Sequence, residues 1–376
     1  MNDELRAAYA GKRVLVTGHT GFKGSWLTVW LKELGAEVTG YALEAEEPSL
    51  FRVLGLASTC EHLIADVRDL AALRKAMRAA RPDFVFHLAA QALVRASYED
   101  PLTTIETNVM GTATVLEAIR VEKLRTHVVV VTSDKCYENR EWLYGYREDE
   151  PMGGHDPYSM SKGAAELVTA NYRRSFFDPA RADEHGVYVA SARAGNVIGG
   201  GDWAKDRIIP DMIRALLSGS PLVVRNPDSV RPWQHVLEPL GGYLLLAARL
   251  AHGDTARRAT RASFCEAFNF GPHLEAARPV RDLADALVSG FGEGSWTDGH
   301  DPRALHEAQL LRLSIEKAYV RLGWRPRWGF DQTIAQTVRF YDAHRKGASG
   351  EELHALVRSQ IAAYAAVADG SSGSEC

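Results

Sequence analysis

The sequence predicts an α/β protein built on a doubly wound parallel sheet with helices on both faces. Two observations support this prediction. Short, wholly apolar segments alternate along the chain with segments whose apolar residues recur every three or four positions. The apolar segments lack the alternation of a strand with one solvent-facing side, so we expect them to be buried on both faces.

The first strand and helix are clearly marked. Arg13–Thr17 (RVLVT) is rich in β-branched residues and predicts a strand that ends at Gly18. Phe22–Leu34 places its tryptophans and leucines at helical spacing, and Gly35 ends that helix. Further strands are predicted at Glu37–Leu43, Glu61–Ala65, Phe84–Leu88 and Val128–Thr132, and helices at Leu70–Ala80 and Thr103–Arg120.

The second half of the chain has a different character. Residues 197–232 contain three consecutive glycines and four prolines, which predicts loops and short elements. Glu238–Leu250 is a predicted helix, Ala267–Gly271 a candidate last strand, and 280–366 mostly helical. The expected division is a main domain at 1–196, joined again by 233–272, a smaller mixed and mostly helical lobe at 197–232 and 273–368, and a disordered tail at 369–376.

Composition excludes several classes of function. The 44 basic and 48 acidic residues give a net charge of −4, which argues against a nucleic-acid-binding protein. No stretch reaches the roughly 20 apolar residues of a membrane span, and Met1–Gly11 lacks the apolar core of a signal peptide. Four scattered cysteines form no CxxC pair, so we expect no disulfide framework, no metal site and a cytoplasmic location (Cys60, Cys136, Cys265 and Cys376).

A glycine-rich turn stands between the first strand and the first helix. In Gly18-His19-Thr20-Gly21-Phe22-Lys23-Gly24, the first glycine permits the tight turn and Gly21 lets a pyrophosphate approach the backbone. Gly24 allows the helix to pack closely on the strand, and the phosphates would lie at the helix N-terminus. This placement favours dinucleotide binding in a Rossmann-type domain, whereas Lys23 contacts either the phosphates or water.

The residues expected around the adenosine are less distinct. The second strand ends without the usual acidic residue for the ribose, so one of Glu44, Glu46 and Glu47 serves instead or all three lie in a solvated loop. No arginine is placed for a 2′-phosphate, which favours NAD over NADP. Asp66 follows the third strand and is a candidate for the adenine amino group, the alternative being a helix N-cap, a role that Asp69 fits equally.

Tyr158 and Lys162 form a YxxxK pair. Residues i and i+4 share a helix face, so the ammonium can lie beside the phenol. The positive charge favours the phenolate, and we therefore expect the phenol pKa to be lowered toward neutrality. Alone the pair is a common accident on helices, but together with the glycine turn it indicates an oxidoreductase-type centre.

At these motifs the chain resembles the extended short-chain dehydrogenase/reductase family, and within it the branch of CDP-glucose 4,6-dehydratases. The resemblance extends from about residue 11 to about residue 345. It is carried by the glycine turn, the Tyr158–Lys162 pair and four further stretches, namely HLAAQ (87–91), TSDKCYEN (132–139), ARAGNVIGGGDW (192–203) and RPWQHV (231–236).

The resemblance implies an internal redox reaction on a nucleotide hexose, with NAD as the cofactor. Tyr158 would take the C4 hydroxyl proton, and Lys162 would hold the nicotinamide ribose. The 4-ketone acidifies C5, water leaves across C5 and C6, and hydride returns to C6. The implied cofactor contacts are Gly18, Thr20, Gly21, Phe22, Lys23, Gly24, Asp66, Val67, Leu88, Ala89, Ala90, Tyr158 and Lys162.

The elimination needs an acid for the C6 hydroxyl and a base for C5. In the dTDP-glucose branch these are adjacent Asp and Glu residues, but here the motif gives Ser133-Asp134-Lys135. Asp134 remains the expected acid if its carboxyl is protonated. Lys135 is either the C5 base in its neutral form or a positive charge beside the enolate. Ser133 either hydrogen-bonds the sugar O4 or satisfies the backbone at the strand end.

Arginines are the expected ligands of the nucleotide diphosphate, because the guanidinium matches phosphate geometry. The candidates are Arg193, Arg207, Arg225 and Arg231, of which Arg207 and Arg231 are preferred. Asn196 is expected to donate to a phosphate oxygen. Trp203 and Trp233 either line the pocket or pack in the core, and Thr17 and His87 are expected to support the fold.

Two other functions of this fold class remain open at this point. A 4-epimerase or decarboxylase would keep the YxxxK pair without needing Asp134 and Lys135, and a non-catalytic NAD-binding scaffold would commonly lose the pair. The family also implies a homodimer, with a tetramer as the alternative. The candidate seam comprises Thr103–Arg120 and Ser159–Arg174, although their apolar residues fit the sheet equally well.

Overall fold

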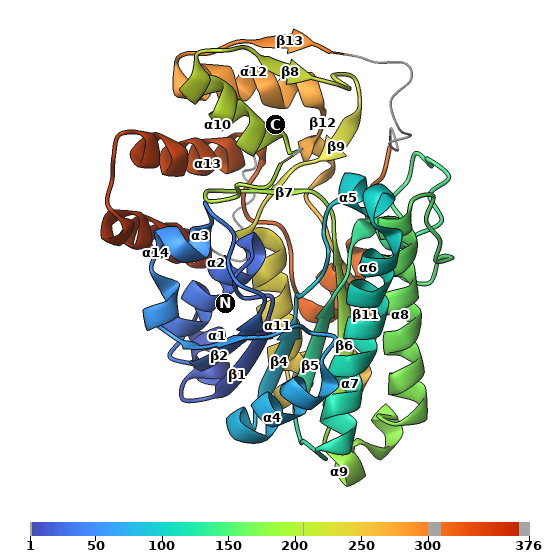
Figure 1. Cartoon of the computed structure of the whole chain (residues 1–376). Helices are drawn as coiled ribbons and strands as arrows, with labels where there is room; N and C mark the ends of the chain where they lie inside the picture. Colours follow the sequence, from blue (N-terminus) through green and yellow to red (C-terminus); the bar gives the residue numbers. More distant parts are fainter. Residues whose placement is uncertain (1, 206, 300–309, 368–376) are drawn as a thin grey trace.

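A seven-stranded parallel sheet forms the centre of the fold (Figure 1). The computed structural model describes residues 2–205, 207–299 and 310–367. In spatial order the strands are β11 (Ala267–Phe270), β6 (Tyr188–Ala194), β5 (His127–Val131), β4 (Phe84–His87), β1 (Arg13–Thr17), β2 (Glu37–Ala42) and β3 (Glu61–Ile64). Every predicted strand is confirmed, including the candidate last one, which joins the sheet at its edge. The predicted fold class is also confirmed.

Helices cover both faces of this sheet, as the apolar strands require. On β1, Val14 and Val16 belong to one buried apolar cluster while Leu15 belongs to the opposite one. The first face is covered by α1 (Asn2–Tyr9), α2 (Phe22–Glu33) and α11 (Leu237–His252). The second is covered by α4 (Leu70–Ala80), α7 (Gly111–Val121) and α8 (Pro157–Ser175).

The helix predicted at 103–120 is interrupted. The chain forms α5 (Val94–Glu99) and α6 (Pro101–Ile105), then a π-helical turn, η2 (Glu106–Met110), before α7. Inside that turn Asn108 accepts a hydrogen bond from the Gln91 backbone N–H at 2.8 Å and donates to Ser161 at 2.8 Å. The periodicity of the sequence did not indicate this turn, because a π-turn changes the apolar phase by one residue only.

A smaller lobe lies over the carboxyl ends of the strands (Figure 1). Three short strand pairs lie in this lobe or at its boundary with the sheet. They are β7 (Val197–Ile198) with β10 (Gln234–His235), β8 (Leu222–Val224) with β13 (Trp296–Asp298), and β9 (Val230–Pro232) with β12 (Ala277–Pro279). Its helices are α10 (Ile208–Ser218), α12 (Val280–Phe291) and α13 (Phe330–Arg345). The expectation of loops and short elements at 197–232 was therefore wrong for α10, whose Pro210 lies in the first turn, where proline is tolerated.

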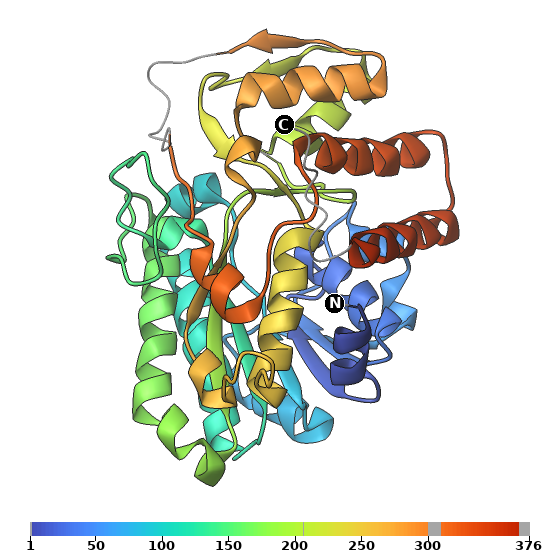
Figure 2. The ribbon, with the colours of Figure 1, turned by 180° about the vertical axis from the view of Figure 1, so that it is seen from behind.

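The remaining elements are short connections and the last helix. They are α3 (Leu50–Val53), η1 (Leu56–Ser58), η3 (Asp134–Cys136), η4 (Pro179–Arg181), α9 (Ala182–His185), η5 (Arg261–Phe264), η6 (Leu274–Ala276), η7 (Ala318–Leu322) and α14 (Gly350–Ala366). Figure 2 shows α14 beside the N-terminal part of the chain, where its Tyr364 packs edge-on against Trp30 of α2. The tail predicted at 369–376 lies outside the described residues.

The carboxyl of Glu238 joins three separated segments. It lies at the start of α11 and is fully buried. Its Oε1 accepts the backbone N–H of Trp328 at 2.7 Å, and its Oε2 accepts the Tyr364 hydroxyl of α14 at 2.8 Å. Burial raises the pKa of Glu238 to about 7, although these hydrogen bonds oppose the shift.

We predict that this carboxyl makes the protein less stable as the pH rises from about 4.5 to about 7. The folded pKa lies above the unfolded value, so only the folded chain keeps the proton between about pH 4.5 and pH 7. The stabilisation is complete below that window and is lost through it, by up to about 3 kcal/mol. The Glu238→Gln variant, measured by denaturant unfolding, should lack this slope. A slope unchanged by the substitution would contradict the assignment.

The glycine turn leaves no room for side chains at two positions. Gly18 has φ +77°, and a Cβ there would lie 2.7 Å from the Ala89 nitrogen. A Cβ at Gly24 would lie 2.1 Å from the Gly18 carbonyl oxygen, which brings α2 directly against the turn. A Cβ at Gly21 meets only that same oxygen, at 3.4 Å.

We therefore predict that two matched substitutions change the free energy of unfolding by different amounts. Gly24→Ala forces backbone apart and should lower the free energy of unfolding by about 2 kcal/mol or more. Gly21→Ala should change it by less than about 1 kcal/mol, since its Cβ meets ordinary contacts. Denaturant unfolding of both variants checks this, and equal stabilities would show that the turn can relax around Gly24.

Candidate active site

A cavity of about 1350 Å³ opens at the carboxyl edge of the sheet, between the sheet and the smaller lobe. The strands end there, so side chains from distant parts of the sequence meet in one place. Nearly all the site residues predicted from sequence lie on its wall, namely Gly18, Thr20, Gly21, Phe22, Lys23, Gly24, Asp66, Val67, Leu88, Ala89, Ala90, Ser133, Asp134, Lys135, Tyr158, Lys162, Asn196, Trp203, Arg207, Arg225 and Arg231.

At the glycine turn, the N-terminus of α2 faces the cavity. Gly21 is its N-cap residue and offers no side chain to the first N–H groups of the helix. Those donors and the helix dipole suit a diphosphate. Behind the turn, Thr17 accepts the Ala89 N–H at 3.2 Å and contacts His87 at 2.8 Å, so both polar side chains brace the loop as expected.

The N-cap of α4 is Asp69 and not Asp66. The Asp69 side chain accepts the Ala72 N–H at 3.0 Å. Asp66 lines the cavity and pairs with Arg68 at 2.7 Å, and this hydrogen-bonded pairing lowers the pKa of the carboxyl. Asp66 therefore does not have the capping role that was its alternative.

The acidic loop after β2 has its own partner. Glu44 and Glu47 both form ion pairs with Arg52, at 2.6 and 2.8 Å. Glu44 and Glu46 line the cavity. Of the three acids that are candidates for the ribose, Glu47 is therefore the one that does not line the cavity.

Tyr158 and Lys162 lie on one face of α8, beside the end of β5. Both are nearly buried, at 8% and 5% exposure. Burial raises the pKa of the Tyr158 phenol to about 12, although a hydrogen bond with Ser133 and the charge of Arg207 act in the opposite direction. We expected the Lys162 charge to lower the pKa of the Tyr158 phenol toward neutrality. For the protein side chains by themselves this expectation is wrong, because desolvation of the phenolate outweighs the nearby positive charges.

The acid and base candidates lie next to this pair. Asp134 is 2% exposed and accepts the Ser133 hydroxyl at 3.0 Å. The Lys135 ammonium is 3.6 Å from the Asp134 carboxylate and donates to the Asn196 side chain at 3.4 Å. Asn196 therefore orients Lys135 in this structure, a contact that the sequence did not predict.

Two further cations point into the same space. The pKa of Lys23 is lowered to about 8 by burial and then by Arg207 and Lys162. The Arg207 guanidinium pairs with Asp202 at 2.8 Å, which holds it against the cavity wall. Asp202 lies inside the ARAGNVIGGGDW stretch, but the sequence alone did not single it out, because only the folded chain shows its partner.

The aromatic and arginine candidates separate into two groups. Trp203 lines the cavity and packs edge-on against Tyr341, with ring centroids 5.3 Å apart. Trp233 also lines the cavity, but it is only 4% exposed and donates to the Arg278 carbonyl, so most of its side chain packs in the core. Arg193, a candidate for the diphosphate, is instead buried in an ion pair with Glu166 and does not line the cavity.

Two negative findings concern the described residues. Nowhere among them do three or more His, Cys, Asp or Glu side chains gather as a metal-binding group. In the same part of the chain, no helix combines the length and apolar character that crossing a membrane requires.

Comparison with known proteins agrees with this geometry. A CDP-glucose 4,6-dehydratase of Salmonella typhimurium is 50% identical over 359 residues, covering 95% of this chain and 97% of that protein. A dTDP-glucose 4,6-dehydratase of Streptomyces antibioticus is 29% identical, covering 88% of this chain and 93% of that protein.

The fold is shared with solved enzymes. The dTDP-glucose 4,6-dehydratase of Streptomyces venezuelae, solved with NAD bound, superposes with a TM-score of 0.74 at 26% identity, covering 89% of this chain and 98% of that chain. The family model described as GDP-mannose 4,6 dehydratase matches residues 15–337. The chain therefore belongs to this family and is a sugar-nucleotide 4,6-dehydratase.

Proposed function

We propose that the chain is an NAD-dependent CDP-glucose 4,6-dehydratase, which converts CDP-D-glucose to CDP-4-dehydro-6-deoxy-D-glucose. The observation that carries the proposal is the meeting of Ser133-Asp134-Lys135 with Tyr158 and Lys162 in one cavity. An epimerase needs the tyrosine but not an acid and a base for elimination. The identity of 50% to a CDP-glucose enzyme supports the choice of nucleotide.

Residues of the glycine turn and α2 would hold the NAD diphosphate, with Asp66 and Val67 at the adenine and Leu88, Ala89 and Ala90 along the cofactor. NAD bound there would supply the hydride acceptor for the oxidation at C4 and the hydride donor for the reduction at C6. Lys162 would donate to the nicotinamide ribose and bring positive charge toward Tyr158. That charge adds to the effects of Ser133 and Arg207 in opposing the burial of the phenolate.

The proton transfers fall to this chain's own side chains. Tyr158 would accept the C4 hydroxyl proton while Ser133 holds O4. The neutral amine of Lys135 would then take the C5 proton, and Asp134 would give its proton to the departing C6 hydroxyl, so that water leaves. The buried position of Asp134 and its distance of 3.6 Å to the Lys135 ammonium support placing both groups on one bond of the sugar.

The smaller lobe would bind the nucleotide. Arg207, Arg225 and Arg231 from 197–232 would meet the two phosphates, and Trp203 would line the pocket. Asn196 would turn from Lys135 to a phosphate oxygen or bridge both. On this proposal 1–196 with 233–272 is the NAD-binding domain, and 197–232 with 273–368 is the sugar-nucleotide lobe.

The function is tested by incubating the protein with CDP-glucose and NAD in deuterated water and analysing the product by NMR. We expect a 4-keto-6-deoxy sugar with a C6 methyl group, deuterium at C5 and no net NADH. A C4 epimer without C6 reduction would contradict the proposal in favour of an epimerase. Turnover of another nucleotide sugar alone would keep the mechanism and overturn the choice of CDP-glucose.

Two substitutions should stop the reaction at different points. Lys135→Met should lower turnover by about 100-fold or more while NADH accumulates on the enzyme, because C4 is oxidised but C5 keeps its proton. Tyr158→Phe should form no NADH, since oxidation itself fails. If Lys135→Met still exchanges the C5 proton with solvent, Lys135 is not the base and supplies only charge.

We also propose that two copies of the chain associate through α6, η2 and α8. The apolar residues Val115 and Leu116 are fully buried against the sheet and cannot form a seam. By contrast Leu102, Met110 and Leu167 are 70%, 56% and 62% exposed on these neighbouring elements. Exposed apolar side chains gathered on adjoining helices are typical of an interface.

Leu167→Arg should therefore convert a dimer to a monomer in light scattering, because it buries an unpaired charge in the interface. Leu274→Arg is the matched control, since Leu274 is 66% exposed on η6, away from this seam, and should leave the dimer intact. A dimer that survives Leu167→Arg would place the interface elsewhere.

A further inference from the structure

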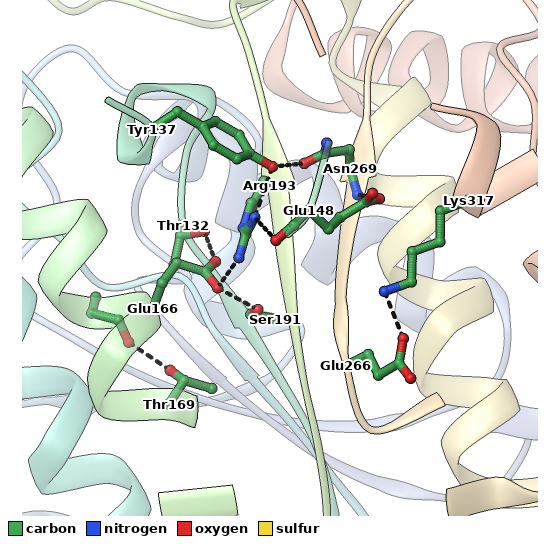
Figure 3. Close-up of polar contacts among 11 residues, drawn as sticks. Thr132, Tyr137, Glu148, Glu166, Thr169, Ser191, Arg193, Glu266, Asn269 and Lys317 are labelled. Atoms are coloured by element: carbon green, nitrogen blue, oxygen red, sulfur yellow. Dashed lines mark hydrogen bonds and ion pairs between the residues drawn. The ribbon is translucent and has the colours of Figure 1, made fainter. Parts of the chain in front are cut away.

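A buried ion pair lies behind the catalytic cavity, between Glu166 of α8 and Arg193 of β6 (Figure 3). The Arg193 nitrogen is 2.8 Å from the Glu166 carboxylate, and both side chains are 5% exposed. Removing two charges from water is costly, so a pair of this kind needs complete hydrogen bonding. Neither residue enters the mechanism described above.

Glu166 is held by donors from three directions. Its Oε2 accepts the Ser191 hydroxyl at 2.7 Å and the Arg193 guanidinium at 2.8 Å. Its Oε1 accepts the Thr132 hydroxyl. Thr132 directly precedes Ser133, so one carboxylate fastens α8 to the segment that carries the serine, acid and base candidates.

Arg193 continues the network away from Glu166. Its other terminal nitrogen donates to the Tyr137 hydroxyl at 2.7 Å and to the Glu148 carbonyl at 3.0 Å. Tyr137 in turn donates to Asn269 of β11 at 2.8 Å. Tyr137 follows η3 directly, so the network holds both ends of the segment from Thr132 to Tyr137.

The position of Glu166 on α8 relates it to the YxxxK pair. Tyr158, Lys162 and Glu166 are four residues apart, and such residues share one face of a helix. Burial lowers the pKa of Lys162 to about 8, and the negative charge of Glu166 is the largest influence that opposes this. Burial would raise the pKa of Glu166 itself, but Arg193 and the hydroxyl donors keep it below its usual value.

We propose that Glu166 is a positioning residue for Lys162: it places a negative charge one helical turn from the buried ammonium and, through Thr132, Ser191 and Arg193, holds this turn of α8 against the segment Ser133-Asp134-Lys135. Arg193 keeps Glu166 ionised. The inference rests on the proposed function, because that function gives Lys162 its role toward the nicotinamide ribose. A purely structural ion pair would hold α8 on the sheet equally well but would not affect the proton equilibrium of Lys162.

The test is the pH dependence of two quantities, kcat/KM for CDP-glucose and the affinity for NAD measured by tryptophan fluorescence. Both should fall on the alkaline side as Lys162 loses its proton. Glu166→Gln removes the anion, so we expect the alkaline limb of each pH profile, the part where the value falls with rising pH, to shift to lower pH by about one pH unit. Near neutral pH the loss should then be small and should grow with pH.

A matched control is available on β11's side of the sheet. Glu266 forms an ion pair with Lys317 at 2.6 Å, and both side chains are partly exposed (Figure 3). Glu266→Gln also removes one carboxylate from an ion pair, but Glu266 is not on the cavity wall. Its alkaline limbs should match those of the wild type.

Two more variants keep the test decisive if Glu166→Gln fails to fold. Glu166→Gln/Arg193→Gln removes both charges of the ion pair, so Arg193 is not left unpaired, and its alkaline limbs should move down to the same extent. Glu166→Asp keeps the charge and should hold the limbs within about half a pH unit of the wild type. Lower rates with unmoved limbs in the Gln variants would overturn the proposal. The proposal would also be overturned if the alkaline limbs of Glu166→Asp were shifted to lower pH as far as those of Glu166→Gln.

Failure of the proposed function is distinguishable from failure of this inference. If the wild type turns over no CDP-glucose, the proposed substrate is wrong, and the NAD affinity profile still tests Glu166 alone. If the wild type is active and the limbs of Glu166→Gln do not move, the function stands and the role of Glu166 is overturned.

Discussion

The fold depends on the burial of both faces of a parallel sheet. Strands covered on both sides favour apolar side chains along their length, as the division of Val14, Leu15 and Val16 between two apolar clusters illustrates. Polar groups are therefore displaced to the carboxyl ends of the strands. The cavity forms there because Thr132-Ser133-Asp134 and the glycine turn both begin where an apolar strand stops.

β6 departs from this constraint, and the departure joins fold to chemistry. Ser191 and Arg193 are polar residues inside a fully buried strand. Each is tolerated because Glu166 of α8 supplies the partner it needs. The sheet thus holds α8 by polar contacts as well as by apolar packing, and the polar contacts fall on the turn of the helix next to Lys162.

The parts of the fold and site that follow from local sequence could be predicted. Each strand depends on a few consecutive apolar residues, and the glycine turn and the Tyr158–Lys162 pair depend on short fixed spacings. The parts that failed depend on distant partners. Arg193 looks like a diphosphate ligand until Glu166, 27 residues earlier in sequence, is placed beside it, and Lys135 gives no sign of its contact with Asn196. The helix at α10 was missed because prolines and glycines around it dominated the local composition.

Burial alone does not make a usable base. It raises the pKa of Tyr158 and lowers that of Lys162, so each effect moves the pair away from a phenolate beside an ammonium. The Glu166 carboxylate opposes the lowering of the Lys162 pKa, and the Ser133 hydroxyl and the Arg207 charge oppose the raising of the Tyr158 pKa. Apolar residues in place of both Glu166 and Arg193 would spare the desolvation of a buried ion pair. They would also remove the negative charge next to Lys162, and this charge is the role that we propose for a buried carboxylate at this turn of α8.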